Sequence, residues 1–308
     1  MLLLFMYSMF TLRAQTDTNT VNQLNKLADV YEQQGNYTTS NNYANQALQL
    51  AQQLNFKKGE ASALNNLGLI QYNQGNLSEA LGFYTSSYKI CKSTNYKNGM
   101  ASFFCNTGLV YIDLENYNEA IIKYVSALKI YQAIHNEAGE ALCYNHLGTV
   151  YAKQQKFTKA LAHHNMALKI RVQLHDTLAL ADSYQNIGYI YYCKKDFNEA
   201  LNYYNLALTT NLQTNNVWAQ AYSYTCLGNT YENVNNQAQA LKNYLAALQI
   251  YRQLNSIDDL VELYSSISQV YTQIQNYTEA SYYKSEYQKL TEKLNPTKYY
   301  STQNYSTN

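Results

Sequence analysis

Five glycines recur at one fixed interval along the chain, and this spacing constrains the fold more than any other feature of the sequence. They are Gly68, Gly108, Gly148, Gly188 and Gly228, each 40 positions after the one before. Extending the register outward reaches two further small residues, Ala28 and Ser268. A fixed period of this length is typical of solenoids, in which each structural repeat packs on its neighbours and no single central core exists.

Two more columns keep the same step. Twelve positions after the glycine column lies a column of small residues: Ser40, Ala80, Ala120, Ala160, Ala200, Ala240 and Ala280. Sixteen positions after it lies a mostly aromatic column: Ala44, Tyr84, Tyr124, His164, Tyr204, Tyr244 and Lys284. Because several columns keep step over seven copies, coincidence is an implausible explanation. The aromatic column breaks down in the outermost copies, as expected where a repeat lacks a neighbour.

Each copy has the pattern of two helices. The 308 residues contain one Pro and 11 Gly, too few for the turns of a sheet protein of this length. In the third copy, residues 101–113 place Phe104, Gly108 and Tyr111 along one helical side. Asn118 then suits an N-cap, and a second helix runs to about residue 133. Small residues at Gly108 and Ala120 would allow the paired helices to approach closely.

At these columns the chain resembles the tetratricopeptide repeat (TPR) family. The fifth copy shows the resemblance best, at Tyr184, Ile187, Gly188, Tyr191, Ala200, Tyr204 and Ala207. The resemblance implies an all-α, right-handed superhelical solenoid of about seven helix-turn-helix repeats over residues 15–293. The 40-residue repeat is longer than the form of roughly 34 that is commoner in the family. The extra length is expected in the second helix and its loop.

The two ends of the chain differ from the repeats. Residues 2–12 form an apolar run of eleven, which is too short to span a membrane but fits the core of a signal peptide cleaved after Ala14. Residues 1–14 are therefore expected to be a signal peptide, and the protein periplasmic or secreted. The alternative is a cytoplasmic protein with a buried or disordered N-terminus. The polar residues 294–308, which include Pro296, are expected to form a flexible tail.

The start of the sequence also bears on the source. The 40-residue repeats and the Ala-Gln-Thr-Asp segment at residues 14–17 resemble periplasmic TPR proteins and sensor ectodomains of Bacteroidetes-type bacteria. Nothing after the N-terminal run approaches the length of a membrane span, so no integral membrane segment is expected in the mature chain.

Composition and motifs argue against several classes of function. The net charge is +1 and only 14% of residues are charged, so no basic stripe for nucleic acid is expected. The sequence has no phosphate-binding Gly-rich loop and no His-Glu-x-x-His or Gly-x-Ser-x-Gly motif. His164 lies in the aromatic column and fits a core position. We expect no enzyme activity, no cofactor and no metal.

The TPR resemblance implies that the first helix of each repeat lines a concave groove. Two positions before the glycine column, the chain carries Lys26, Asn66, Asn106, His146, Asn186, Cys226 and Ser266. An asparagine offers both a donor and an acceptor, as a peptide unit does. The column therefore resembles the asparagine ladder by which some TPR proteins hold an extended peptide. The alternative is a polar, solvated face. The candidate peptide-binding residues are Asn65, Asn66, Tyr72, Asn106, Asn145, His146, Asn186, Tyr189 and Asn229.

Two functions of different class follow. The first is a protein-interaction scaffold that binds an extended segment of a protein or peptide partner in the groove. The second is a sensory or regulatory module that acts on a separate signalling protein, and a structural spacer is a third alternative. The groove positions carry few charges and no cluster of Lys or Arg that could hold a terminal carboxylate. A neutral ligand held by aromatic and amide side chains is therefore expected.

Overall fold

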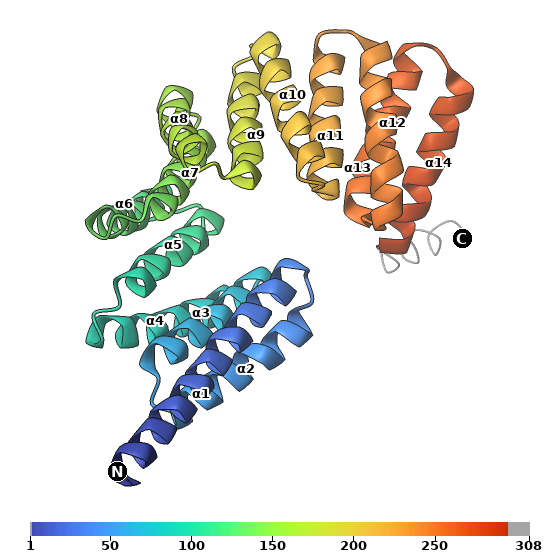
Figure 1. The fold of residues 1–308 in the computed structure, drawn as a ribbon. Helices are drawn as coiled ribbons and strands as arrows, with labels where there is room; N and C mark the ends of the chain where they lie inside the picture. Colours follow the sequence, from blue (N-terminus) through green and yellow to red (C-terminus); the bar gives the residue numbers. More distant parts are fainter. Residues whose placement is uncertain (1, 295–308) are drawn as a thin grey trace, which may run out of the picture. The chain divides into compact units, whose positions relative to one another are not determined.

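The chain is all-α, as expected. A computed structural model describes the backbone of residues 2–294 and the side chains from residue 17 onward, so the expected tail at 295–308 lies outside the described residues. The described part contains fourteen helices (Figure 1): α1 (Leu2–Gln33), α2 (Tyr37–Gln53), α3 (Lys57–Asn73), α4 (Leu77–Ser93), α5 (Lys97–Asp113), α6 (Tyr117–Ala133), α7 (Glu137–Lys153), α8 (Phe157–Gln173), α9 (Thr177–Cys193), α10 (Phe197–Gln213), α11 (Val217–Asn233), α12 (Gln237–Leu254), α13 (Ile257–Gln273) and α14 (Tyr277–Leu294). Sequential antiparallel pairing gives about seven helix-turn-helix repeats.

The helices are evenly spaced. From α2 onward the helices begin at a constant interval, which is half of the repeat period, and most of them have the same length. A repeat therefore divides into two equal halves, and the expectation of a longer second helix is wrong. Residues 2–16 are helical and continuous with the rest of α1. Their side chains lie outside the described residues, and the signal peptide remains a prediction.

The turns repeat one backbone conformation. In the turn between α5 and α6, Glu115 has a φ of 55° in the left-handed region. The N–H of Asn116 donates to the carbonyl of Tyr111 at 2.8 Å, and that of Glu115 donates to Ile112 at 2.9 Å. This pair of bonds is the Schellman motif that ends a helix. Left-handed residues recur every 20 positions in the described turns: Gly35, Asn55, Gly75, Asn95, Glu115, His135, Gln155, His175, Lys195, Asn215, Asn235, Asn255 and Gln275.

The residue after the left-handed position also starts the next helix. The Asn116 side chain accepts from the backbone N–H of Glu119 at 3.3 Å, which makes Asn116 the N-cap of α6. Asn36, Asp196 and Asn236 occupy the same position and make the same bond. The N-cap expected at Asn118 is therefore wrong by two residues, because the turn is shorter than the sequence suggested.

The chain divides into two compact units, residues 1–156 and 157–308. Unit 1 contains α1 to α7 and unit 2 contains α8 to α14. Within unit 1 the first helices α1, α3 and α5 pack on the second helices α2, α4 and α6, and each of these second helices packs on the next first helix. Unit 2 follows the same order from α8 to α14. Each unit is thus a stack of helices in which most contacts join neighbours in sequence, and successive first helices such as α1 and α3 also touch.

The glycine column marks the closest approach within a repeat. A Cβ added to Gly108 would lie 2.7 Å from Cζ of Tyr124, and one added to Gly188 would lie 2.8 Å from the ring of Tyr204. Gly68 faces Tyr84 in the same way. These tyrosines are at most 2% exposed. The expectation that small residues allow the paired helices to approach closely is confirmed. The group that packs against each of these glycines is an aromatic ring.

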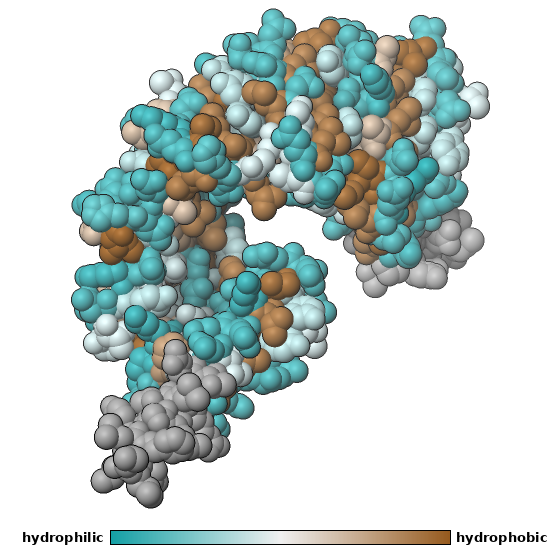
Figure 2. Space-filling view, viewed as in Figure 1, coloured by the Kyte–Doolittle hydropathy of each residue, from teal (hydrophilic) through white to brown (hydrophobic). Residues whose placement is uncertain are grey.

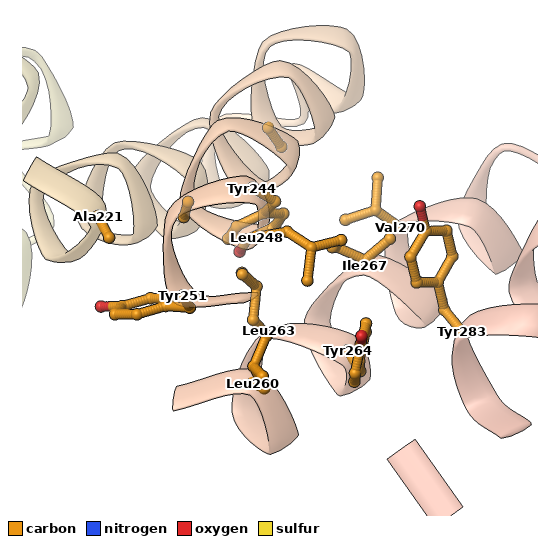
Figure 3. Close-up of a cluster of buried hydrophobic side chains, with 12 residues drawn as sticks. Ala221, Tyr244, Leu248, Tyr251, Leu260, Leu263, Tyr264, Ile267, Val270 and Tyr283 are labelled. Atoms are coloured by element: carbon orange, nitrogen blue, oxygen red, sulfur yellow. The ribbon is translucent and has the colours of Figure 1, made fainter. Parts of the chain in front are cut away.

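The core of unit 2 shows how repeats interlock (Figure 3). Tyr244 and Tyr251 of α12 are buried together with Leu263 and Ile267 of α13. In the last repeat the aromatic column reads Lys284, but Tyr283 is buried beside it and stacks on Tyr271, with ring centroids 5.6 Å apart. The same stack joins Tyr191 to Tyr203 in the fifth repeat, where Tyr204 also fills the column, so Tyr283 belongs to a second aromatic position one residue before the column. Between residues 2 and 294, no helix combines the length and apolar character needed to cross a bilayer.

Replacing Gly108 by Ala should destabilise the protein. The added methyl would meet a fully buried ring, and overpacking of this kind typically costs about 1–3 kcal/mol. The matched control is Gly82→Ala in α4, where an added Cβ meets no atom within 4 Å. That change should raise the free energy of unfolding by about 0.5–1 kcal/mol, because Ala is the better helix former. Urea denaturation of both variants measures the difference. Losses of equal size would show that the close approach is unimportant.

Candidate functional site

Contacts between residues 41 positions apart join α1 to α3 and α3 to α5 in unit 1, and α9 to α11 and α11 to α13 in unit 2. We call the surfaces formed by the first helices the first-helix face of unit 1 (α1, α3, α5 and α7) and of unit 2 (α9, α11 and α13). In unit 1 the side-chain donors are Asn66, Asn73 and Asn106, which bond to Asn25, Glu32 and Asn65. In unit 2, Gln185 donates to Cys226, Asn233 to Tyr192, Trp218 to Asp259, and Gln273 to Glu232. Neighbouring first helices are therefore offset by one residue from the 40-residue period.

The asparagines predicted as a peptide ladder take part in these contacts. Asn66 is only 7% exposed, and its amide donates to the backbone carbonyl of Asn25 at 3.0 Å. Asn25 in turn donates to the carbonyl of Gly59 at 3.2 Å. Asn106 donates to the side-chain oxygen of Asn65 at 2.8 Å. Part of the hydrogen-bonding capacity of the column thus joins one repeat to the next, and peptide binding by these residues remains a prediction.

The other predicted site residues differ in exposure. His146 stacks on Tyr124 with ring centroids 4.9 Å apart, and the side chain of Asn229 accepts from the Tyr244 hydroxyl at 2.6 Å. Tyr72 is half-buried, and burial together with Asp113 raises the pKa of its hydroxyl. Tyr189 is 52% exposed. Four more predicted residues complete the set: Asn145 and Asn186 are half-buried, and Gly148 and Gly228 are buried.

Unit 1 contains a polar cavity on its first-helix face. Its volume is about 350 Å³, and three successive first helices contribute to its wall. The lining side chains include Asn22, Asn25, Lys26, Asp29, Ser62, Asn65, Asn66 and Ser102, with Ser87, Cys91 and Tyr96 behind them. Amide and hydroxyl groups dominate this set. The cavity can therefore offer both donors and acceptors to a bound polar group.

Asp29 is the group in this cavity with the most altered chemistry. Burial and, to a smaller extent, the nearby Glu32 raise its pKa to about 6, while a hydrogen bond with Asn66 acts in the opposite direction. Sequence reasoning missed Asp29, Asn22 and Asn25. Asn25 lies 40 positions before Asn65, so the repeat register could have identified it. It was missed because the aromatic column breaks down in the outermost repeat.

Two cysteines meet on the same face. The Sγ atoms of Cys105 in α5 and Cys143 in α7 lie 3.7 Å apart, and both side chains are buried. The 38 positions between Cys105 and Cys143 match neither the 40-residue period nor the 41-residue offset, so the sequence contains no signal of this contact. Among the side chains of residues 17–294, no three His, Cys, Asp or Glu converge closely enough to hold a metal ion.

The pKa of Asp29 predicts a pH-dependent stability. The folded protein retains this proton up to about pH 6, whereas the unfolded chain releases it near the ordinary value of 3.8. Protonation of Asp29 therefore favours folding. Its stabilising contribution to the free energy of unfolding is fully present below about pH 4 and is lost as the pH rises through 6. Asp29→Asn removes this loss, so its melting temperature relative to wild type should increase between pH 4 and pH 7.5. Differential scanning calorimetry measures this change. A constant difference across that range would contradict the assignment.

Comparison with known proteins identifies the repeats. Family models described as tetratricopeptide repeat match residues 20–93, 99–173 and 140–212, and a further one matches residues 220–259. A search of curated proteins finds no match.

Solved structures of similar fold are distant in sequence. The apo form of RapI is 14% identical, with a TM-score of 0.65 over 90% of this chain and 99% of that chain. A Rap protein complexed with Competence and Sporulation Factor is 15% identical, with a TM-score of 0.59 over 91% and 99%. A signal transduction ATPase with a tetratricopeptide repeat sensor, from Pyrococcus horikoshii, is 17% identical, with a TM-score of 0.67 over 91% of this chain and 43% of that one. Together with the paired helices and the glycine column, the family matches show that the chain belongs to the tetratricopeptide repeat family.

Proposed function

We propose that this protein is a non-enzymatic interaction scaffold that binds an extended segment of a protein partner along its first-helix faces. The observation that carries the proposal is the polar cavity of unit 1, to which three successive first helices contribute. An extended peptide has one donor and one acceptor in nearly every residue. A row of amides and hydroxyls along consecutive helices is suited to such a chain.

The contacts between repeats distinguish the asparagines that hold the cavity wall in place from those that could touch a ligand. Asn66 is buried and bonded across to α1, so it fixes the position of the cavity wall. Asn65 is half-buried, and its side-chain oxygen accepts from Asn106. Its own amide N–H₂ group remains the chemically matched donor for a peptide carbonyl. Ser62 and Ser102 line the same space with hydroxyls. Asn65, Ser62 and Ser102 are therefore the ligand-contacting groups in this proposal, and Asn66 positions them.

A second candidate function is a sensory or regulatory module that acts on a separate signalling protein. It is favoured by the similarity of fold to a Rap protein that binds Competence and Sporulation Factor and to an ATPase whose repeats are a sensor. Binding of a ligand next to Asp29 would change the burial of that carboxyl group and its pKa. A change in binding to a separate signalling protein when this ligand is added would favour this function over a passive scaffold.

A variant that fills the cavity tests the scaffold proposal. A partner is first isolated on the full-length chain, and its bound segment is then defined with overlapping peptides. Ser62→Phe should weaken binding of that segment at least tenfold, because the ring occupies the space that the segment needs. Fluorescence anisotropy measures the affinity. The matched control is Ser86→Phe in α4, an exposed second-helix position, which should bind as wild type does. Full affinity of a folded Ser62→Phe variant, or a partner recognised only as a folded domain, would reject the proposal.

We also propose that the protein acts outside the cytoplasm of a bacterium. The support is the apolar run at residues 2–12, followed by Ala14. When the full-length gene is expressed in a bacterial host, N-terminal sequencing of the recovered protein should begin at or near Gln15. An intact Met1 on protein recovered from the cytoplasm would contradict export.

A further inference from the structure

The first-helix face of unit 2 carries exposed aromatic rings. Tyr189 of α9 is 52% exposed, and Trp218 and Tyr222 of α11 are 48% and 40% exposed. Trp218 and Tyr222 stack with ring centroids 5.4 Å apart and an interplanar angle of 9°. In Figure 2, hydrophobic residues interrupt the hydrophilic surface of unit 2. Large exposed rings on one face are typical of binding surfaces, where Trp and Tyr contribute most of the binding energy.

The charges of the same helices are of one sign. The helices α9, α11 and α13 contain no Lys, Arg or His, and they contain five carboxylates: Asp182, Glu232, Asp258, Asp259 and Glu262. Between residues 157 and 294, every Lys and Arg lies on a second helix or in the turn between α9 and α10. Asp258 and Glu262 are exposed, whereas Asp182 lies near Arg171 of α8, which partly offsets its charge. The face therefore has a negative potential although the whole chain is nearly neutral.

The rings and the carboxylates are in contact with each other. The indole Nε1 of Trp218 donates to the carboxylate of Asp259 at 3.2 Å, and Asp259 also accepts from the hydroxyl of Ser256. The Cys226 thiol and burial raise the pKa of Tyr222 to about 12, and Tyr189 and Glu262 add to this rise. Tyr222 thus lies within electrostatic reach of both a second ring and an acid. These residues form one patch across three repeats.

We propose that this patch binds the Arg or Lys side chains of an extended, positively charged partner segment. The inference rests on the proposed function and specifies the chemistry of the segment at unit 2. An aromatic face attracts a cation placed within about 6 Å of its centroid, because the ring carries negative charge density above its plane. A guanidinium group also stacks on flat rings and bonds to carboxylates with two parallel hydrogen bonds. Exposed Tyr and Trp beside Asp and Glu supply both partners.

The same arrangement disfavours other ligands. A segment rich in Asp or Glu, or a phosphate backbone, would meet repulsion with no compensating cation on these three helices. The neutral ligand expected from the sequence is revised for unit 2, because that expectation did not consider the acids of α13. For the amide-lined cavity of unit 1 it is unchanged.

A labelled probe peptide tests the proposal on the full-length chain. The probe is a nine-residue peptide of alternating Arg and Ser, compared with peptides in which every Arg is Gln or Glu. The Arg peptide should bind at least tenfold more tightly than the Gln peptide, and the Glu peptide should not bind. Binding should weaken as NaCl rises from 50 to 300 mM, because salt screens exposed charges. Fluorescence anisotropy gives the affinities.

Two variants and a control separate this patch from general attraction by charge. The double variant Trp218→Ala with Tyr222→Ala should weaken binding of the Arg peptide at least tenfold. The double variant Asp258→Asn with Glu262→Gln should weaken this binding severalfold and reduce its salt dependence. The matched control is Tyr277→Ala with Glu292→Gln on α14, where both side chains are exposed. The control should bind as wild type does. Circular dichroism confirms that each variant is folded.

Equal affinity for the Arg and Gln peptides would overturn the proposal. So would equal losses in the aromatic variant and the control, because the loss would then not be specific to this patch. These outcomes are distinct from failure of the proposed function. If Ser62→Phe abolishes binding of the natural partner segment while the aromatic pair has no effect on any peptide, the scaffold proposal stands and only the cation assignment is wrong.

Discussion

The packing of a tyrosine ring against a glycine backbone is the contact on which the rest of this structure depends. At Gly108 and Gly188 the ring occupies the volume that any larger residue would need, and it thereby fixes the distance between the two helices of a repeat. The ring also spans the repeat. The hydroxyl of Tyr244 extends to Asn229 and Glu232 on the neighbouring first helix. In this repeat a single side chain of the second helix therefore sets the spacing of the two helices and bonds to the polar groups next to the first-helix face.

The first-helix faces of the two units have different chemistry on the same backbone frame. In unit 1 the face offers amides and hydroxyls around a cavity. In unit 2 it offers stacked rings and carboxylates. The exposed positions of each first helix are less tightly packed than the glycine and tyrosine columns, so they can vary with less effect on the stack. In a repeat protein of this kind, the residues at the few positions not used for packing determine which ligand the surface favours.

The paired helices and the small columns could be predicted from the sequence because packing of like residues repeats at a fixed interval. The turns could not be placed to the residue, since a left-handed position filled by Glu115, His135 or Lys195 has no compositional signal, whereas one filled by Gly35 does. The contacts of the face were missed for a geometrical reason. Columns were compared at intervals of 40, but neighbouring first helices meet at intervals of 41, so the pairing of Asn65 with Asn106 was not visible. Asp29 was overlooked because the outermost repeat was regarded as degenerate.

The shared residue at each turn limits how the length of the chain can change. Asn116 both completes the end of α5 and caps the start of α6, so no spare position exists between the helices. A single inserted residue within a helix would rotate everything after it by about 100° and separate rings from their glycines. Duplication of one complete repeat, by contrast, keeps every turn, every cap and every contact between neighbouring first helices in register. The gene can therefore lengthen or shorten its product by gain or loss of whole repeats. The remaining first helices then keep their contacts with one another.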